Sequence, residues 1–118
     1  MISLELAKEL KAAGLEWVPV KGDFWAYRLV DNGIGVVDST VRPGQEPHPN
    51  NIWLPRLDQL LAEIEARGWW WWMSWSGKVW VGRKDNDKGG HELETDTPED
   101  AAAKALLWIL SQDAQKQA

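Results

Sequence analysis

The sequence predicts an α+β domain with two layers, in which three helices pack on about six antiparallel strands in the order α-βββ-α-βββ-α. Three observations support this class. Apolar residues recur with helical spacing in three segments, and with a period of two in the segments between them. The first two helices and the strands that follow them also look alike, which indicates an internal pseudo-repeat. We therefore expect one domain over 1–118, with halves 3–38 and 57–95 and a closing helix over 97–111.

The first two helices are delimited by capping residues and glycines. A helix over 3–13 is expected because a serine can cap its start, leucines share one face, and Gly14 provides the stop. A second helix over 55–67 begins with a proline, keeps the i, i+3, i+4, i+7 apolar spacing, and ends at Gly68.

The closing helix over 97–111 follows the sequence TDTPED. Thr97 is expected as its N-cap and Pro98 as its first residue, with Asp100 completing a variant of the capping box. Alanines and leucines then form an apolar stripe, and the polar end SQDAQKQA is expected to fray.

The strands are expected at EWVPV (16–20), FWAYRLV (24–30), IGVVD (34–38), WWWWMSW (69–75), KVWVGR (78–83) and HELET (91–95). The alignment of the two halves matches Gly14 with Gly68, Gly22 with Gly77, Trp17 with Trp71, Trp25 with Trp80 and Arg28 with Arg83. The segment 39–53 contains three prolines and is expected to be an irregular loop, either mobile or a lid over the sheet.

The run WWWW has two sides in a strand. After a C-terminal glycine the chain packs back on its helix, so Trp69, Trp71 and Met73 are expected to face the helices, and Trp17, Pro19, Trp25 and Tyr27 to do so in the first half. A two-residue turn at Ser76-Gly77 then places Val79 and Val81 on the outer face with Trp70 and Trp72. Arg28 and Arg83 are expected at the margin of this face.

An outer face made of Trp70, Trp72, Val79 and Val81 is unusual, because a solvated sheet face should alternate to polar residues. It requires cover from within the chain, a contact with another chain, or a stacking ligand. We expect a non-enzymatic accessory protein that binds a partner protein or a second copy of itself, since Trp and Arg dominate interface hot spots. The alternative is a module that stacks a carbohydrate or a single-stranded nucleic acid on Trp70 and Trp72.

Composition narrows the remaining classes of function. The 118 residues contain ten Trp and no Cys, and their net charge is −5, so a nucleic-acid backbone is an improbable partner. The absence of cysteine fits the cytoplasm, and the apolar runs are too short to span a membrane. No catalytic, metal-binding or cofactor-binding motif is found: Asp85–Gly90 only partly matches a calcium loop, and His48 and His91 lack ligand spacing.

Most of the chain resembles small uncharacterised proteins encoded in bacterial phage and prophage regions. The resemblance lies in PRLDQLLAEIEARG (55–68) with the aromatic hairpin that follows it, and in TPEDAAAKALLWILSQ (97–112). It implies a leading helix, aromatic strands and a closing helix, and it supplies no catalytic residue. The WWWW run departs from the pattern, in which Tyr and Phe are more usual.

Overall fold

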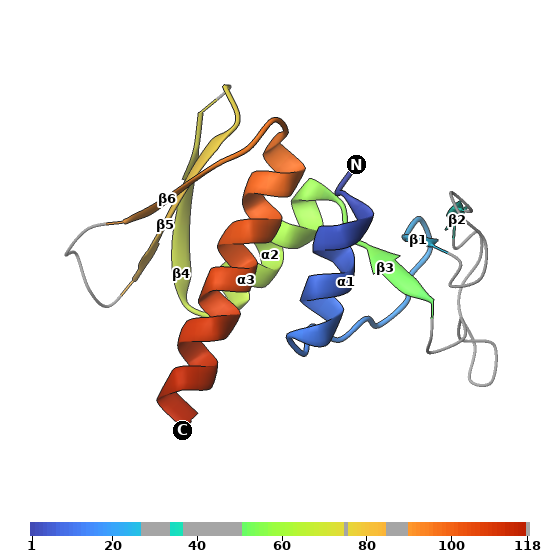
Figure 1. Ribbon diagram of the computed structural model, residues 1–118, viewed down its shortest axis with the longest axis horizontal. Helices are drawn as coiled ribbons and strands as arrows, with labels where there is room; N and C mark the ends of the chain where they lie inside the picture. Colours follow the sequence, from blue (N-terminus) through green and yellow to red (C-terminus); the bar gives the residue numbers. More distant parts are fainter. Residues whose placement is uncertain (27–33, 37–50, 75, 85–89, 118) are drawn as a thin grey trace.

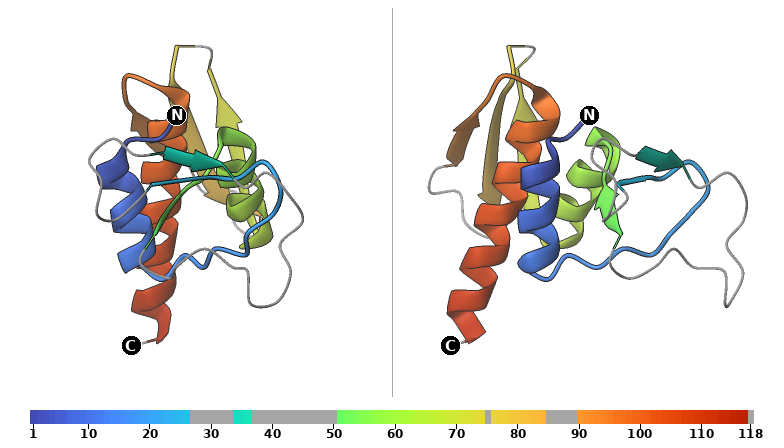
Figure 2. Two further views of the ribbon diagram at one scale, coloured as in Figure 1. Left: turned by 90° about the vertical axis from the view of Figure 1, so that its right-hand side faces the viewer. Right: turned by 45° about the vertical axis from the view of Figure 1, so that its right-hand side comes forward.

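In the computed structural model, the three helices lie between two three-stranded antiparallel sheets (Figure 1). The structure describes residues 1–26, 34–36, 51–74, 76–84 and 90–117. The α+β class and the order α-βββ-α-βββ-α are confirmed. The two sheets lie on opposite sides of the helices (Figure 2), so that α1 packs on the first sheet and α2 and α3 pack on the second.

The first helix, α1, spans Leu4–Ala12 and has the ends that the sequence predicts. The Ser3 hydroxyl oxygen accepts a hydrogen bond from the Leu6 amide at 3.3 Å, which satisfies one of the free donors at the helix start. The helix ends before Gly14, whose φ is +98°. Leu6 and Leu10 face the core.

The second helix, α2, spans Leu57–Ala66, with Arg56 as its N-cap. The side-chain oxygen of Gln59 accepts a hydrogen bond from the Arg56 amide at 2.9 Å, so a glutamine in the first turn performs part of the capping. The helix therefore starts two residues after Pro55. It ends before Gly68, whose φ is +85°, as predicted.

The closing helix, α3, spans Pro98–Gln117 and is longer than the predicted 97–111. Thr97 caps it, because its hydroxyl oxygen accepts a hydrogen bond from the Asp100 amide at 3.2 Å. The Asp100 carboxylate does not return to this cap. It accepts a hydrogen bond from the Ser3 amide at 2.8 Å and so joins the starts of α3 and α1.

The first sheet contains β1 (Phe24–Ala26), β2 (Ile34–Val36) and β3 (Ile52–Leu54) in the order β2-β1-β3. The prediction of a strand over 16–20 is wrong, and the third strand of this sheet is β3, whose first two residues fall in the segment 39–53 that was predicted to be a loop. The reason is local: the chain turns back at 20–23, where the Asp23 amide donates to the Val20 carbonyl oxygen at 3.1 Å.

The second sheet contains β4 (Trp69–Met73), β5 (Lys78–Arg83) and β6 (His91–Glu94), which are antiparallel in the order β4-β5-β6. Helices α2 and α3 cover one face of this sheet, α2 under β4 and α3 under β5 and β6 (Figure 1).

The core lies between α2, α3 and the second sheet, with α1 packed on α3. Its alanines on α3 have no exposed surface, and these small side chains allow close packing of the neighbouring elements. Larger core side chains with almost no exposure come from every helix and from β5: Leu10, Leu60, Ile64, Leu106, Ile109, Val79 and Val81.

The four glycines that the repeat alignment matches share one backbone conformation. Gly14 and Gly68 follow α1 and α2, and Gly22 and Gly77 precede the central strands β1 and β5. Their φ values lie between +85° and +98°, a region that favours glycine.

Candidate functional site

The outer face of the second sheet carries the most exposed indole among the residues that the structure describes. Trp72 on β4 is 57% exposed and pairs across the ladder with Trp80 on β5, which in turn pairs with Glu92 on β6. The ring centroids of Trp72 and Trp80 lie 4.6 Å apart at an interplanar angle of 55°. The two indoles therefore form one tilted aromatic pair that spans the edge strand β4 and the central strand β5.

Charged residues flank this pair on the same side of the sheet. Lys78 pairs with Glu94 across the ladder, and its ammonium nitrogen lies 3.5 Å from a carboxylate oxygen of Glu92. All three side chains are partly or well exposed. We call this surface the outer tryptophan face, and it consists of Trp70, Trp72, Trp80, Lys78, Glu92 and Glu94.

Trp70 completes the aromatic part of the face in a different way. Its cross-strand partner is Gly82, and a Cβ atom built at Gly82 would overlap the indole ring. A Cβ atom at Gly90 would lie 2.8 Å from the same ring. Trp70 thus lies flat over two glycines and is only partly exposed.

The predicted outer positions are confirmed for Trp70 and Trp72 and wrong for three other residues. Val79 and Val81 have no exposed surface and belong to the core, opposite Met73 and Trp71 in the ladder.

Arg83 also lies on the helix side of the sheet, where its guanidinium carbon is 5.3 Å from the centroid of Trp69. Trp69 is 5% exposed and makes an edge contact with Trp108 of α3, with ring centroids 5.3 Å apart. This arginine therefore stacks on a core indole. The sixth candidate, Arg28, lies outside the described residues.

The length of the β4–β5 turn explains the error. The predicted two-residue turn would pair residues of unlike parity, for example Met73 with Trp80. In the structure the Ser74 amide donates to the Lys78 carbonyl oxygen at 2.9 Å, so the turn has three residues between this bonded pair, one more than predicted, and Met73 pairs with Val79. This single shift moves Val79 and Val81 inward and Trp80 outward.

The equivalent aromatic row of the first sheet has a cover from within the chain. Trp25 on β1 pairs with Trp53 on β3, and Trp17 stacks on Trp53 with centroids 6.4 Å apart and rings nearly parallel at 5°. Trp17 and Trp25 were predicted to face the helices. In the structure Trp17 stacks on Trp53, whereas Trp72 of the second sheet remains 57% exposed.

The buried carboxylate of Asp23 holds Trp17 against Trp53. From the sequence alone, Asp23 is only a residue of a predicted turn. Asp23 is 1% exposed and accepts hydrogen bonds from the Trp17 indole at 2.9 Å, the Val20 amide at 3.0 Å and the Gln59 amide nitrogen at 2.6 Å. The Arg56 guanidinium lies 3.6 Å from it. These partners satisfy the charge and connect the segment before β1 to the start of α2.

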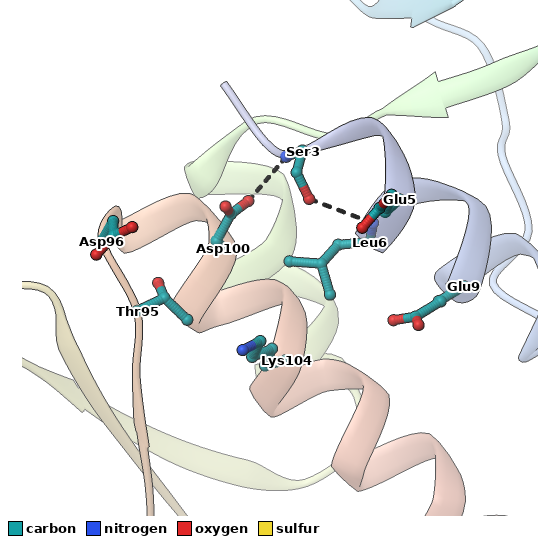
Figure 3. A pocket seen from close by; sticks show the side chains of 8 residues that line it. All are labelled: Ser3, Glu5, Leu6, Glu9, Thr95, Asp96, Asp100 and Lys104. Carbon is teal, nitrogen blue, oxygen red and sulfur yellow. Dashed lines mark hydrogen bonds between the residues drawn. The ribbon is translucent and has the colours of Figure 1, made fainter.

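A pocket of about 420 Å³ lies between the first turn of α1 and the start of α3 (Figure 3). Its lining is mostly charged: Ser3, Glu5, Leu6, Glu9, Thr95, Asp96, Asp100 and Lys104. Ser3 and Asp100 are already engaged in the two hydrogen bonds drawn there. The described residues contain no group of three potential metal ligands.

His91 was expected at the surface and is exposed, and its ring stacks on Trp108 with centroids 4.2 Å apart. The possible calcium loop and His48 fall largely or wholly outside the described residues. Within the part of the chain that the structure describes, no helix is long and apolar enough to cross a membrane.

No protein-family model matches the chain, and comparisons with curated proteins and with solved structures returned no match.

Proposed function

We propose that the outer tryptophan face is the contact surface for a partner protein, which presents an aromatic side chain to the Trp72–Trp80 pair and basic side chains to Glu92 and Glu94. The observation that carries this proposal is the 57% exposure of Trp72 on the edge strand β4, at 4.6 Å from Trp80 on the central strand β5.

The free energy gained by burying Trp72 is as large as that of a typical interface hot-spot residue. An indole buries about 150–250 Å² in a complete contact, so covering the exposed part of Trp72 contributes roughly 2–4 kcal/mol at about 25 cal/mol per Å². Tryptophans bordered on one side by charged residues also resemble the core and part of the rim of an interface. Lys78, Glu92 and Glu94 supply that rim.

The first sheet and the net charge of the chain indicate what kind of partner would fit. There, Trp17 stacks on Trp53 and donates its indole N–H to a carboxylate, Asp23. The second sheet offers a similar arrangement, since Glu92 lies beside Trp80. A partner aromatic residue can occupy the place that Trp17 takes in the first sheet. The net charge of −5 favours the approach of a basic protein.

A carbohydrate is the second candidate, favoured by one observation. Hydrogen-bonding side chains adjoin the indoles: Lys78 and Glu92 stand on the same face beside Trp80. A sugar ring stacked on Trp72 could use both. For a single-stranded nucleic acid, the exposed Glu92 and Glu94 would repel the phosphates, so the carbohydrate is the stronger of the two ligand classes.

The proposal includes a cytoplasmic, non-enzymatic accessory role of the phage-encoded type. The resemblance of the middle and closing helices to small phage proteins supports the role. The cysteine-free sequence fits a reducing compartment.

The experiment compares the wild type with Trp72→Ala and Trp80→Ala. Immobilised proteins are incubated with host lysate, bound proteins are identified by mass spectrometry, and the strongest binder is purified and titrated by calorimetry. Both substitutions should weaken its binding by ~30-fold or more, the weight of a hot-spot residue. Val18→Ala, at a position that is 78% exposed in the other half, is the matched control and should bind as the wild type does.

Two results would contradict the proposal. Equal recovery of the binder by wild type and Trp72→Ala, with both folded by near-ultraviolet circular dichroism, would exclude the face as a protein contact. Saturable quenching of tryptophan fluorescence by an oligosaccharide, lost in Trp72→Ala, would favour the second candidate instead.

A further inference from the structure

Strand β4 is an edge of its sheet without the features that usually protect an edge. Among the residues that the structure describes, β4 pairs with β5 alone. Its residues are four tryptophans and a methionine, with neither charge nor proline. The opposite edge, β6, carries exposed His91, Glu92 and Glu94. Charged side chains hinder pairing between edge strands, so β6 is protected from pairing and β4 is open to it.

The backbone groups at the open edge of β4 follow from the ends of its ladder. The Ser74 amide donates to the Lys78 carbonyl oxygen at 2.9 Å, and the Lys84 amide donates to the Gly68 carbonyl oxygen at 3.1 Å. In an antiparallel pair, alternate residues form these bonds. Even-numbered residues of β4 therefore bond to β5. The N–H and C=O groups of Trp69, Trp71 and Met73 point toward the open edge.

We propose that β4 pairs antiparallel with β4 of a second copy of this chain, which joins the two three-stranded sheets into one of six strands. The pairing is centred on Trp71, which lies opposite Trp71 of the second copy. Trp69 is then opposite Met73 of the other chain, and each of these residues exchanges hydrogen bonds with its counterpart. This arrangement is a two-fold symmetric interface.

The register follows from the faces of the sheet. Edge-directed groups are found only on odd-numbered residues of β4, so odd residues must pair with odd residues. The helices of both copies then lie on the same side of the joined sheet, because Trp69 and its odd-numbered neighbours face the helices. On the outer face Trp70 comes opposite Trp72 of the second copy, and such aromatic cross-strand pairs are favourable.

A second copy is the occupant that this edge fits. The strand is self-complementary in the register above, and it is uncharged in a chain of net charge −5. The Glu65 carboxylate of α2 is near this edge and accepts a hydrogen bond from the Trp71 indole at 2.7 Å. Two acidic copies repel each other least where the facing strands themselves carry no charge. The contact uses the backbone groups at the edge of β4, whereas the proposed partner contact uses side chains of the outer tryptophan face, of which Trp70 and Trp72 are on β4 and Trp80 is on β5. The two proposals can therefore fail separately.

The first test is sedimentation velocity of the full chain over a range of concentrations. The wild type should form a dimer that dissociates on dilution. Met73→Pro removes one edge-directed N–H and should raise the dissociation constant at least ~tenfold. Met73→Ala, the matched control, removes the side chain and keeps the N–H, so it should dimerise nearly as the wild type does. A monomeric wild type, or equal dimerisation of the two variants, would overturn the proposal.

A second measurement needs no substitution and therefore does not depend on whether the proline variant folds. Amide hydrogen exchange is followed by NMR at a low and a high concentration of the wild type. The amides of Trp69, Trp71 and Met73 should exchange slowly only at high concentration, whereas those of Trp70 and Trp72 should be protected at both. Unchanged exchange at the three edge amides would refute edge pairing.

Trp80→Ala separates this proposal from the proposed function, since Trp80 lies on the central strand and outside the β4 edge. If the variant still dimerises and loses the partner protein, both proposals hold. If Trp80→Ala dimerises and still binds the partner protein, the proposed function alone is wrong. Dimerisation of Met73→Pro at wild-type strength sinks the edge pairing alone.

Discussion

The indole of Trp70 lies across the backbone of Gly82, its cross-strand partner, and leaves no room for a Cβ atom at that glycine. The first sheet repeats the relationship, because Trp25 lies over its partner Gly35 in the same way. In each sheet a glycine opposite a tryptophan lets the indole lie flat on the neighbouring strand. The Trp70 ring lies over Gly82 and Gly90.

Gly82→Ala should therefore destabilise the fold by about 1–3 kcal/mol, the usual cost of forcing an extra carbon into a packed site. Urea unfolding followed by circular dichroism would measure it. The control is a double-mutant cycle: in a Trp70→Ala background the same substitution should cost less than ~0.5 kcal/mol, since the ring that it meets is gone. A full cost in both backgrounds would show that a contact other than the indole makes glycine necessary.

Asp23→Asn should cost about 2–4 kcal/mol of folding free energy. The amide would turn an NH₂ group toward a donor in a site that is 1% exposed and leave Arg56 with a weaker partner. Asp58→Asn is the matched control, because Asp58 also contacts Arg56 but is 71% exposed, and it should cost less than about 1 kcal/mol. Equal effects of the two substitutions in thermal unfolding would argue against the buried network as an anchor.

Val81→Thr tests the register of β5 directly. The substitution keeps the shape and replaces a methyl group by a hydroxyl group, so in a position with no exposure it should cost about 1–2 kcal/mol. Val18→Thr, at 78% exposure, should remain within about 0.5 kcal/mol of the wild type. Similar stabilities of the two variants would place Val81 on the solvent side.

The pKa of Asp58 is lowered below its ordinary value of 3.8, chiefly because the Arg56 side chain donates a hydrogen bond to it at 3.1 Å. A lowered pKa contributes stability that is present above the ordinary value and lost as pH falls through the lowered one. Arg56→Ala should bring the pKa back toward 3.8, as measured by a carbon-13 NMR titration of the carboxyl group. An unchanged midpoint in the variant would remove Arg56 as the cause.

The helices were predictable because their ends are encoded by single residues. Ser3, Thr97, Gly14 and Gly68 act locally, and each caps or stops the helix that the sequence assigns to it. The extension of α3 to Gln117 was missed because the polar composition of the tail suggested fraying, although the tail contains no glycine or proline to stop the helix.

The face of each strand was harder to predict, because it depends on counting residues in a turn. A turn of three residues in place of the predicted two exchanged Val79 and Val81 with Trp80, and thereby changed half of the candidate surface. Trp70 and Trp72 were placed correctly, since their register is set by Gly68 and not by the turn. The third strand, Ile52–Leu54, pairs with β1 over a long sequence separation that no local pattern encodes.

The bond between the Ser3 amide and the Asp100 carboxylate has a consequence for biosynthesis. Its partners are 97 positions apart in the sequence. Ribosomes add about 5–20 residues per second, so Asp100 is translated roughly 5–20 seconds after Ser3. During that interval the leucines of α1 have no closing helix to cover them. A nascent chain stalled before residue 98 should accordingly be captured by chaperones that bind exposed apolar segments, and one released after α3 should escape them.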